Sequence, residues 1–369
     1  GAIVIKDETS DETAFYTPEW VAHEPGHTTE SVRGKLLIAS CRSGSPLASS
    51  VVQRYRQLLA EAGATDEVAY MENVDFQFTD SETCVRLDSD VNGYDVHLFQ
   101  SLYDPTANRS VDENMMAFLI AARAFREWGA NHICAILPYL AYARQDKPTR
   151  YQREPTTAKL MADMAIVAGI DRLITWAPHS PQIHGFYGSM PVDAMEPLSL
   201  FIDEFQRFQG RDDVIAVAPD AGAAEYVLHF SHALNLRTAV ASKHRPRPEE
   251  TVVSEVAGDL TNARVAIVLD DMISTGGTLY AVIERLVQEQ DIQEVYIGVS
   301  HNLCIESARE RLLRLHQDYN LRQVIVTNTI PQTPAFLDLP FLSVRSLAER
   351  FARMINQVHY NRPLAELVR

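Results

Sequence analysis

The stretch VLDDMISTGGTL, residues 268–279, contains side chains whose types and spacing suit a phosphorylated ligand. Gly276 and Gly277 allow positive φ and close approach, so successive backbone N–H groups can converge on an anion. The apolar run before this stretch predicts a buried strand. The periodic run after it predicts a helix, whose positive N-terminal end favours a phosphate at the same point. An ordinary turn with a helix cap explains the hydroxyls and one glycine, but not two aspartates at the end of a buried strand.

The polar side chains of this stretch predict that the ligand has two chemically different ends. Asp270 and Asp271 repel a phosphate, so we expect them to accept hydrogen bonds from neutral hydroxyls of the same ligand, or to hold a cation. The hydroxyls of Ser274, Thr275 and Thr278 can donate to the phosphate. A sugar phosphate meets both demands. The GxxxxGK[ST] and GxGxxG patterns of nucleotide-binding loops do not occur in the chain.

The composition excludes several classes of protein. The chain has 369 residues, of which 46% are hydrophobic, and single cores rarely grow beyond about 250–300 residues, so we expect two domains. A formal net charge of −16 argues against a general nucleic-acid binder. We expect neither a membrane span nor a secretory signal, because the sequence has no long apolar run and no cationic segment leading into one. The four cysteines lie far apart without a CxxC, which fits a reducing cytoplasm.

Short apolar runs alternate with longer segments of helical period from about residue 35 onward. These runs are too apolar on both faces to be half-exposed strands, so they predict parallel sheets covered on both sides. The runs are KLLIAS, DVHLFQSL, HICAILPYL, RLITWA, DVIAVAP, RTAVAS, RVAIVLD, EVYIGVS and QVIVTN.

A stretch with Gly and two prolines, YGSMPVDAMEPLSL, places a domain boundary near residue 192. We therefore expect an extension at 1–34, a first domain at 35–192 joined by a C-terminal helix at 345–360, and a second domain at 193–344. The extension has six acidic residues before position 25 and suggests no chemistry.

The stretch VLDDMISTGGT resembles the phosphoribosyl diphosphate (PRPP) loop of phosphoribosyltransferases and ribose-phosphate pyrophosphokinases. Further stretches are similar to the second of these families, in the same order and spacing over roughly residues 36–360. They are PYLAYARQDK (138–147) with REPTTAKLMAD (153–163), HSPQIHGFY (179–187), APDAGAAEY (218–226) and SKHRPRP (242–248). The resemblance implies an α/β fold of two phosphoribosyltransferase-like domains, each a mainly parallel sheet flanked by helices. The first domain would take ATP and the second ribose 5-phosphate.

The resemblance also implies a reaction, in which the diphosphoryl group of ATP moves to the anomeric hydroxyl of ribose 5-phosphate and gives PRPP and AMP. Lys243 and Arg245 would be catalytic, from a flexible loop that closes over the site. His179 and Asp220 would surround Mg²⁺, and Asp220 would also bind ribose 5-phosphate together with the PRPP loop. On the evidence of their sequence alone, Lys243 and Arg245 could equally be exposed cations on a proline-rich turn, and His179 an ordinary structural histidine.

For the nucleotide, the resemblance nominates one set of residues, namely Phe78, Asp80, Glu82, Arg144 and Gln145. An aromatic ring can stack on adenine while carboxylates accept hydrogen bonds from its amino group or from the ribose. In this family the hairpin residues reach the nucleotide from a neighbouring subunit, which implies a homo-oligomer, either a dimer or a hexamer. The alternative is an edge hairpin whose Phe76 and Phe78 face the core.

Two other functions remain open from the sequence. A non-catalytic regulatory paralogue is suggested by the acidic extension and by Ala177, which stands two residues before His179 where the family has Asp. A phosphoribosyltransferase would use the same loop with PRPP as its substrate. Retention of Lys243, Arg245 and the complete loop favours the active pyrophosphokinase, because a scaffold has no need of them.

Overall fold

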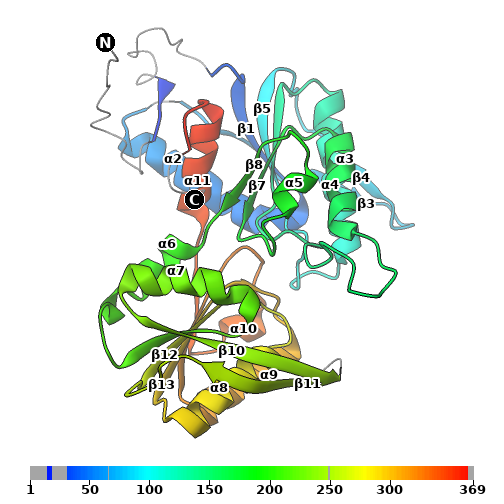
Figure 1. Ribbon diagram of the computed structural model, residues 1–369. Helices are drawn as coiled ribbons and strands as arrows, with labels where there is room; N and C mark the ends of the chain where they lie inside the picture. Colours follow the sequence, from blue (N-terminus) through cyan, green and yellow to red (C-terminus); the bar gives the residue numbers. More distant parts are fainter. Residues whose placement is uncertain (1–14, 19–30, 65, 248–249, 365–369) are drawn as a thin grey trace, which may run out of the picture. The chain divides into compact units, whose positions relative to one another are not determined.

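The structure, a computed structural model, describes residues 15–18, 31–64, 66–247 and 250–364. The chain divides into two compact units (Figure 1). The first unit comprises the chain up to Asp104, Arg109–Glu196, and the chain from Leu347 onward. The second comprises Pro105–Asn108 and Pro197–Ser346. In the described part of the chain, no helix is long and apolar enough to cross a membrane.

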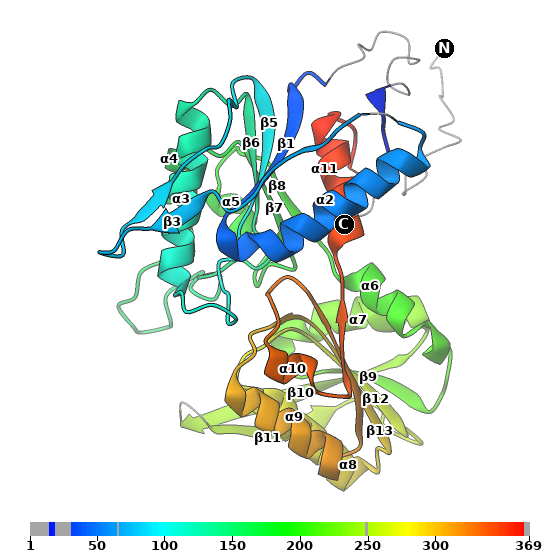
Figure 2. The same ribbon diagram turned by 180° about the vertical axis from the view of Figure 1, so that it is seen from behind.

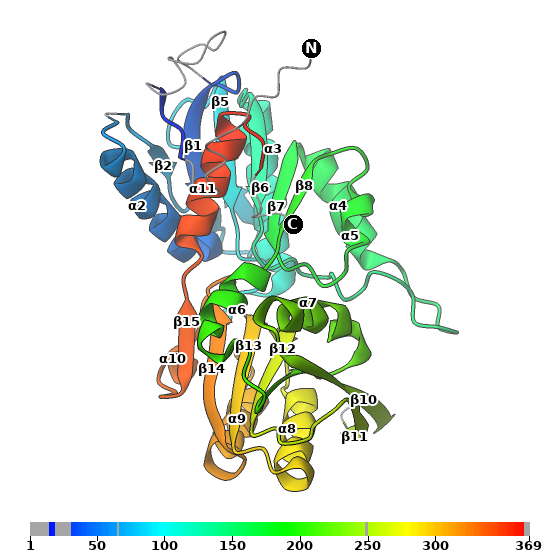
Figure 3. The same ribbon diagram turned by 60° about the vertical axis from the view of Figure 1, so that its left-hand side comes forward.

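The first unit is built on a six-stranded sheet whose described strands all run parallel, in the order β2-β1-β5-β6-β7-β8. Helices α2 and α11 cover one face of this sheet, and α3 and α4 cover the other (Figure 3). A separate antiparallel hairpin, β3–β4, lies beside α3. The strands are β1 Lys35–Ser40, β2 Ala69–Met71, β3 Asp75–Gln77, β4 Thr83–Val85, β5 Tyr94–Phe99, β6 His132–Ile136, β7 Arg172–Trp176 and β8 Val192–Met195. The helices are η1 Arg42–Gly44, α2 Ser45–Glu61, α3 Val111–Glu127, α4 Thr157–Ala168, α5 Ile183–Phe186 and α11 Ala348–His359.

The second unit has a seven-stranded sheet in the order β11-β10-β9-β12-β13-β14-β15. Its described strands pair in parallel except for β10 and β11. Helices α8 and α9 lie side by side on one face, and α6 and α7 lie on the other (Figure 2). The strands are β9 Val214–Ala218, β10 Arg237–Arg247, β11 Glu250–Ala257, β12 Val265–Ile273, β13 Glu294–Asn302, β14 Leu321–Thr327 and β15 Leu342–Arg345. The helices are α6 Leu198–Glu204, η2 Gln206–Phe208, η3 Ala221–Ala223, α7 Ala224–Leu234, α8 Gly277–Gln290, α9 Glu306–Asp318 and α10 Pro334–Leu337.

The predicted fold class is confirmed, since both sheets are mainly parallel and both are flanked by helices. Two segments differ from the prediction. Strand β12 continues past Asp271 to Ile273, because Met272 and Ile273 still pair with β13. The segment at 242–248 was expected to be a loop, but β10 runs through it to Arg247 because it pairs antiparallel with β11. Residues 248 and 249 lie outside the described part of the chain.

The core of the first unit contains one buried carboxylate held by three histidines. Asp95, on β5, accepts hydrogen bonds from His132 of β6 (2.8 Å), His97 of β5 (3.1 Å) and His359 of α11 (2.7 Å). Burial alone raises the pKa of Asp95, but the histidines outweigh it and the pKa lies well below its usual range. The cluster therefore ties α11 to the sheet through a buried charge.

Most of the predicted N-terminal extension lies outside the described residues. Of the described parts, the backbone N–H of Tyr16 donates to Asn356 of α11 (2.7 Å), and the guanidinium of Arg33 donates to the Val358 carbonyl (3.0 Å). Ser31 donates to the His359 carbonyl. The described parts of the extension thus pack against the helix that Asp95 anchors.

Candidate active site

The glycine-rich stretch forms the link between β12 and α8, at the carboxyl end of the second unit's sheet, where open α/β sheets bind ligands. Gly276 adopts φ 76° and caps α8, which begins at Gly277. Leu279 is buried and anchors the first turn of the helix. The backbone N–H groups of that turn have no intrahelical partner, as in any helix, so they are available to an anion.

The two aspartates of this stretch lie on the last part of β12 and are both half-buried. The Asp271 N–H donates to Asp270 Oδ1 (2.8 Å). Burial, and next the negative charges of Asp271 and Asp220, raise the pKa of Asp270 well above its usual value. Three carboxylates are therefore crowded at one end of the sheet, which favours hydroxyl donors or a cation there.

Asp220 follows β9, the strand next to β12, and so reaches the same end of the sheet. Its Oδ1 accepts a hydrogen bond from the Ala223 N–H (3.1 Å), which caps the following turn. Its Oδ2 accepts one from the Lys243 ammonium (2.7 Å). An exposed cation on β10 is thereby held beside the carboxylate cluster.

Lys243 and Arg245 both lie on β10, in extended backbone. Register shifts interrupt the β10–β11 ladder next to Lys243 and again between His244 and Arg247. Irregularities of this kind re-aim side chains and are common near active sites.

In the first unit, three of the residues nominated for the nucleotide lie at the tip of the β3–β4 hairpin. Phe78 is 51% exposed and packs edge-on against Phe76, with ring centroids 5.5 Å apart. Asp80 and Glu82 are exposed, and the Glu82 N–H donates to Asp80 Oδ1 (3.1 Å). The alternative in which Phe78 faces the core is therefore wrong, because its ring is available at the surface.

Arg144 and Gln145 are exposed in the segment between β6 and α4. Together with side chains that the sequence did not single out, they line an open pocket of about 550 Å³. The other lining residues are Ser110, Val111, Asp112, Tyr139, Ala141 and Tyr142. Two tyrosines and an arginine suit a planar ring or a charged group, and the amino end of α3 borders the same space.

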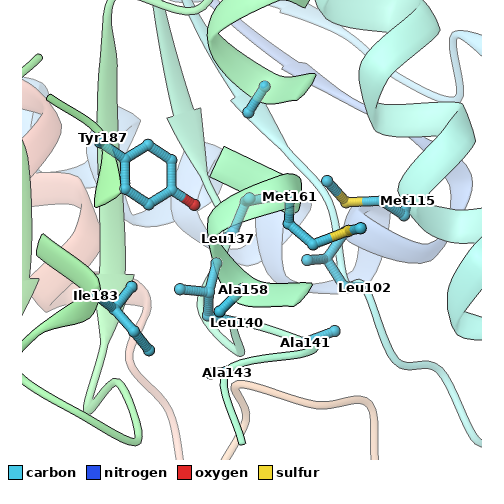
Figure 4. Close-up of a pocket in the computed structure, with 11 residues that line it drawn as sticks. Leu102, Met115, Leu137, Leu140, Ala141, Ala143, Ala158, Met161, Ile183 and Tyr187 are labelled. Carbon is cyan, nitrogen blue, oxygen red and sulfur yellow. The ribbon is translucent and has the colours of Figure 1, made fainter. Parts of the chain in front are cut away.

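The underside of this segment is apolar. Leu137, Leu140 and Ala143 face α4 residues such as Ala158 and Met161 across an enclosed cavity of about 10 Å³ (Figure 4). This volume holds at most one water molecule, so the cavity is a packing feature and no substrate site. The apolar side chains around it anchor the backbone that presents Arg144 and Gln145 to solvent.

His179 is exposed in the turn after β7. Ala177 is buried there with φ 43°, and its N–H donates to the Met195 carbonyl of β8 (2.9 Å). His179 belongs to the first unit and Asp220 to the second. Their predicted sharing of a metal ion therefore stays a prediction.

The described residues offer Mg²⁺ few ligands of their own. Among the described residues, no group of three or more His, Cys, Asp or Glu side chains is arranged to hold a metal ion. Mg²⁺ bound with nucleotides keeps few protein ligands and takes the rest from phosphate oxygens and water. The crowded carboxylates around Asp270 suit a cation that arrives in this way, and Asp220 would be a protein ligand once the Lys243 ammonium leaves its Oδ2.

Residues 274–278 are called the phosphate loop from here on. One residue that borders this loop was missed by the sequence analysis. The guanidinium of Arg311, on α9, donates to the Thr275 carbonyl (2.6 Å). Arg311 lies 36 positions beyond Thr275 and belongs to no motif near it. Nothing in the local pattern of α9 could have identified the contact.

A glycine-capped link from β12 to α8 beside paired aspartates, at the carboxyl end of a helix-covered parallel sheet, is the arrangement expected of a phosphoribosyltransferase-like domain. The family model of the N-terminal domain of ribose phosphate pyrophosphokinase matches residues 36–169, and that of the phosphoribosyl synthetase-associated domain matches residues 214–369. The chain belongs to the ribose-phosphate pyrophosphokinase family.

Individual relatives agree with this assignment. The chain is 34% identical to ribose-phosphate pyrophosphokinase of Clostridium acetobutylicum, over 79% of this chain and 87% of that protein. It is 35% identical to the protein of the same name from Rhodopirellula baltica, over 79% of this chain and 89% of the relative. The crystal structure of phosphoribosylpyrophosphate synthetase from Mycobacterium smegmatis superposes with a TM-score of 0.75 at 30% identity, covering 89% of this chain and 99% of that one. The predicted family and the prediction of an enzyme of PRPP synthesis are confirmed.

Proposed function

We propose that the chain transfers the diphosphoryl group of MgATP to ribose 5-phosphate, with the sugar phosphate bound by the second unit and the nucleotide by the first. The observation that carries the assignment of the sugar site is the end of β12. There, an N–H-rich helix start lies next to Asp270 and Asp271, and Lys243 is paired to Asp220 at the adjacent strand. The combination provides for a phosphate and for hydroxyls on one ligand.

In the sugar site, the backbone N–H groups of Gly276, Gly277 and Thr278 bind the 5-phosphate, with the hydroxyls of Ser274, Thr275 and Thr278 as further donors. Asp270 and Asp271 accept hydrogen bonds from the ribose hydroxyls. This division places the anomeric hydroxyl at the end of the ligand away from the helix start.

In the nucleotide site, Phe78 stacks on adenine, and Asp80 and Glu82 accept from its amino group or from the ribose. Arg144 and Gln145 bind from the pocket beside Tyr139 and Tyr142. We propose that the β3–β4 hairpin acts on the active site of a neighbouring copy, because an exposed aromatic at a hairpin tip is available to a second chain. The working form is then a homo-oligomer, a dimer or a hexamer.

The reaction forms a bond between the anomeric oxygen and the β-phosphorus of ATP, and it breaks the bond between that phosphorus and the oxygen that leaves with AMP. The proton of the anomeric hydroxyl is released. Charge builds on the transferred phosphoryl oxygens and on the departing AMP oxygen. Lys243 and Arg245 stabilise that charge from β10, and Lys243 must exchange its contact with Asp220 for one with the phosphates.

Bound Mg²⁺ would neutralise phosphate charge and align the phosphates for in-line attack, with Asp220 and His179 as its protein ligands.

The protein is expected to work in a reducing cytoplasm, which agrees with the free thiols of Cys41, Cys84, Cys134 and Cys304.

The test is direct. Purified protein is incubated with ATP, Mg²⁺ and ribose 5-phosphate, and AMP, ADP and PRPP are quantified, with ribose in place of ribose 5-phosphate as the control. We expect AMP and PRPP in equal amounts and neither product with ribose. ADP in place of AMP would indicate ordinary phosphoryl transfer. The absence of any product would favour the regulatory paralogue, and the same absence with consumption of added PRPP and a base would favour a phosphoribosyltransferase.

A further inference from the structure

Helix α9 supports the phosphate loop from behind through two residues one turn apart. Ala308 is fully buried, and a Cβ added at Gly276 would lie 3.4 Å from the Ala308 Cα. Arg311 follows on the same side of the helix, and a Cβ added at Gly277 would lie 3.8 Å from its guanidinium carbon. The two glycines therefore lie directly against α9, which runs beside α8 (Figure 2).

Arg311 differs from the neighbouring arginines of α9 in what it contacts. Arg309 pairs with Glu306 (3.4 Å) and Arg314 with Asp318 (3.9 Å), both on the same helix. Within the described residues, Arg311 has no carboxylate partner and donates to the Thr275 carbonyl instead. A charged donor on a backbone carbonyl forms a stronger hydrogen bond than a neutral one.

This bond determines the direction of the peptide group that enters the loop. The peptide between Thr275 and Gly276 is trans, so its C=O and N–H point in opposite directions. With the carbonyl held toward Arg311, the Gly276 N–H points away from α9. A glycine with positive φ lets a peptide group reorient at small cost, so without this bond the carbonyl could turn into the anion site and repel a phosphate.

We infer that Arg311 is a positioning residue for ribose 5-phosphate: it holds the Thr275 carbonyl and so keeps the loop's N–H groups directed at the 5-phosphate. This inference rests on the proposed function. It assigns to α9 a part in substrate binding that involves no contact with the substrate. Because the ATP-side residues lie on other elements, the effect of Arg311 is confined to the sugar phosphate.

The test compares Arg311→Ala and Arg311→Lys with Arg309→Ala. Arg309 is a matched control, since it lies on the same helix and donates to a different backbone carbonyl, that of Ala335 (3.3 Å). Ribose 5-phosphate binding is measured by calorimetry without ATP, the two KM values and kcat by AMP release, and folding by thermal unfolding. Arg311→Ala should weaken ribose 5-phosphate binding about 10- to 100-fold, with kcat and the KM for MgATP within about threefold.

Arg311→Lys should recover part of that affinity, and Arg309→Ala should stay within about twofold of the wild type in all constants. The inference is overturned if Arg311→Ala binds ribose 5-phosphate within twofold of the wild type, or if it loses affinity for both substrates alike. It is also overturned if Arg309→Ala reproduces the loss. If Arg311→Ala does not fold, Arg311→Lys provides the test. A folded Arg311→Lys must still weaken ribose 5-phosphate binding selectively, and unchanged binding overturns the inference. A wild-type protein that does not bind ribose 5-phosphate would instead overturn the proposed function.

Discussion

Two aspartates, one in each unit, stand in opposite electrostatic situations. Asp95 lies near the beginning of β5, is fully buried, and has its carboxylate saturated by three histidines, so that its pKa is lowered. Asp270 lies near the end of β12, is half-buried, and is crowded by Asp271 and Asp220, so that its pKa is raised. The first charge is satisfied within the protein and the second is not.

The difference follows from position along a parallel strand. The carboxyl ends of such strands open toward ligands, whereas their beginnings are closed by loops and packing. A carboxylate at the closed end must find its partners inside the fold. One at the open end can be left with repulsive neighbours, because the ligand supplies the compensation. Substitution of Asp95 is thus expected to lower stability. Asp270 is expected to serve function, and its presence costs stability.

The largest effect is expected at the satisfied charge. Asp95→Ala leaves three buried histidines without their acceptor and should lower the free energy of unfolding by about 3–5 kcal/mol. The measurement is urea denaturation followed by circular dichroism. The control is Asp163→Asn, an exposed aspartate paired with Lys159 on α4, which should cost less than about 1 kcal/mol. Equal costs for the two variants would mean that the three histidines stabilise the fold through Asp95 no more than an exposed ion pair does.

Next in size is the loss of the cation paired to Asp220. Lys243→Ala should lower kcat about 100- to 1,000-fold and change the KM for ribose 5-phosphate less than about threefold, because its contact strengthens in the transition state. The control is His244→Ala, the exposed neighbour on the opposite face of β10, with an expected change in kcat below about threefold. Comparable losses in kcat and in ribose 5-phosphate affinity would contradict the assigned role of Lys243.

Asp270→Asn tests the unsatisfied charge directly. In the unfolded chain the carboxyl pKa is ordinary, about 3.9, while the folded pKa of Asp270 is raised, so the folded state holds its proton to higher pH. Stability therefore falls as pH rises between these two values, and the penalty persists above them. We expect Asp270→Asn to raise the thermal midpoint at pH 8 in EDTA, and this gain to vanish toward pH 4. The KM for ribose 5-phosphate should rise about tenfold.

Asp213→Asn is the counterpart in the same unit. Arg211 lowers the pKa of Asp213, so Asp213→Asn removes a favourable charge pair. The thermal midpoint at pH 8 should be unchanged or slightly lower. A lower midpoint for Asp270→Asn as well would mean that the crowding at the end of β12 is not destabilising.

The smallest effect is expected at the hairpin of the first unit. Phe78→Ala should raise the KM for MgATP about two- to tenfold with little change in thermal stability, because the ring is largely exposed. Trp128→Ala removes another exposed aromatic, 70% accessible, and should leave the KM unchanged. An unaltered KM in Phe78→Ala would mean that this ring does not contact the nucleotide.

Much of the fold could be predicted because its signals are local. Each apolar run became a strand, and the helix after the glycines begins at Gly277, where the positive φ of Gly276 ends the preceding segment. The loop that the resemblance implied at 242–248 is strand as far as Arg247. Its extended form depends on antiparallel pairing with β11, in which Lys243 lies opposite Val253.

By itself, the sequence determined the parallel α/β arrangement, the phosphate loop and its twin aspartates, since periodicity and glycine conformations act over a few residues. Only the tertiary structure decided which charges are satisfied. Asp95 meets histidines from β5, β6 and α11, Lys243 meets Asp220, and Arg311 meets the Thr275 carbonyl across 36 positions. Such contacts depend on how whole elements pack, and their strength depends on the burial that packing creates.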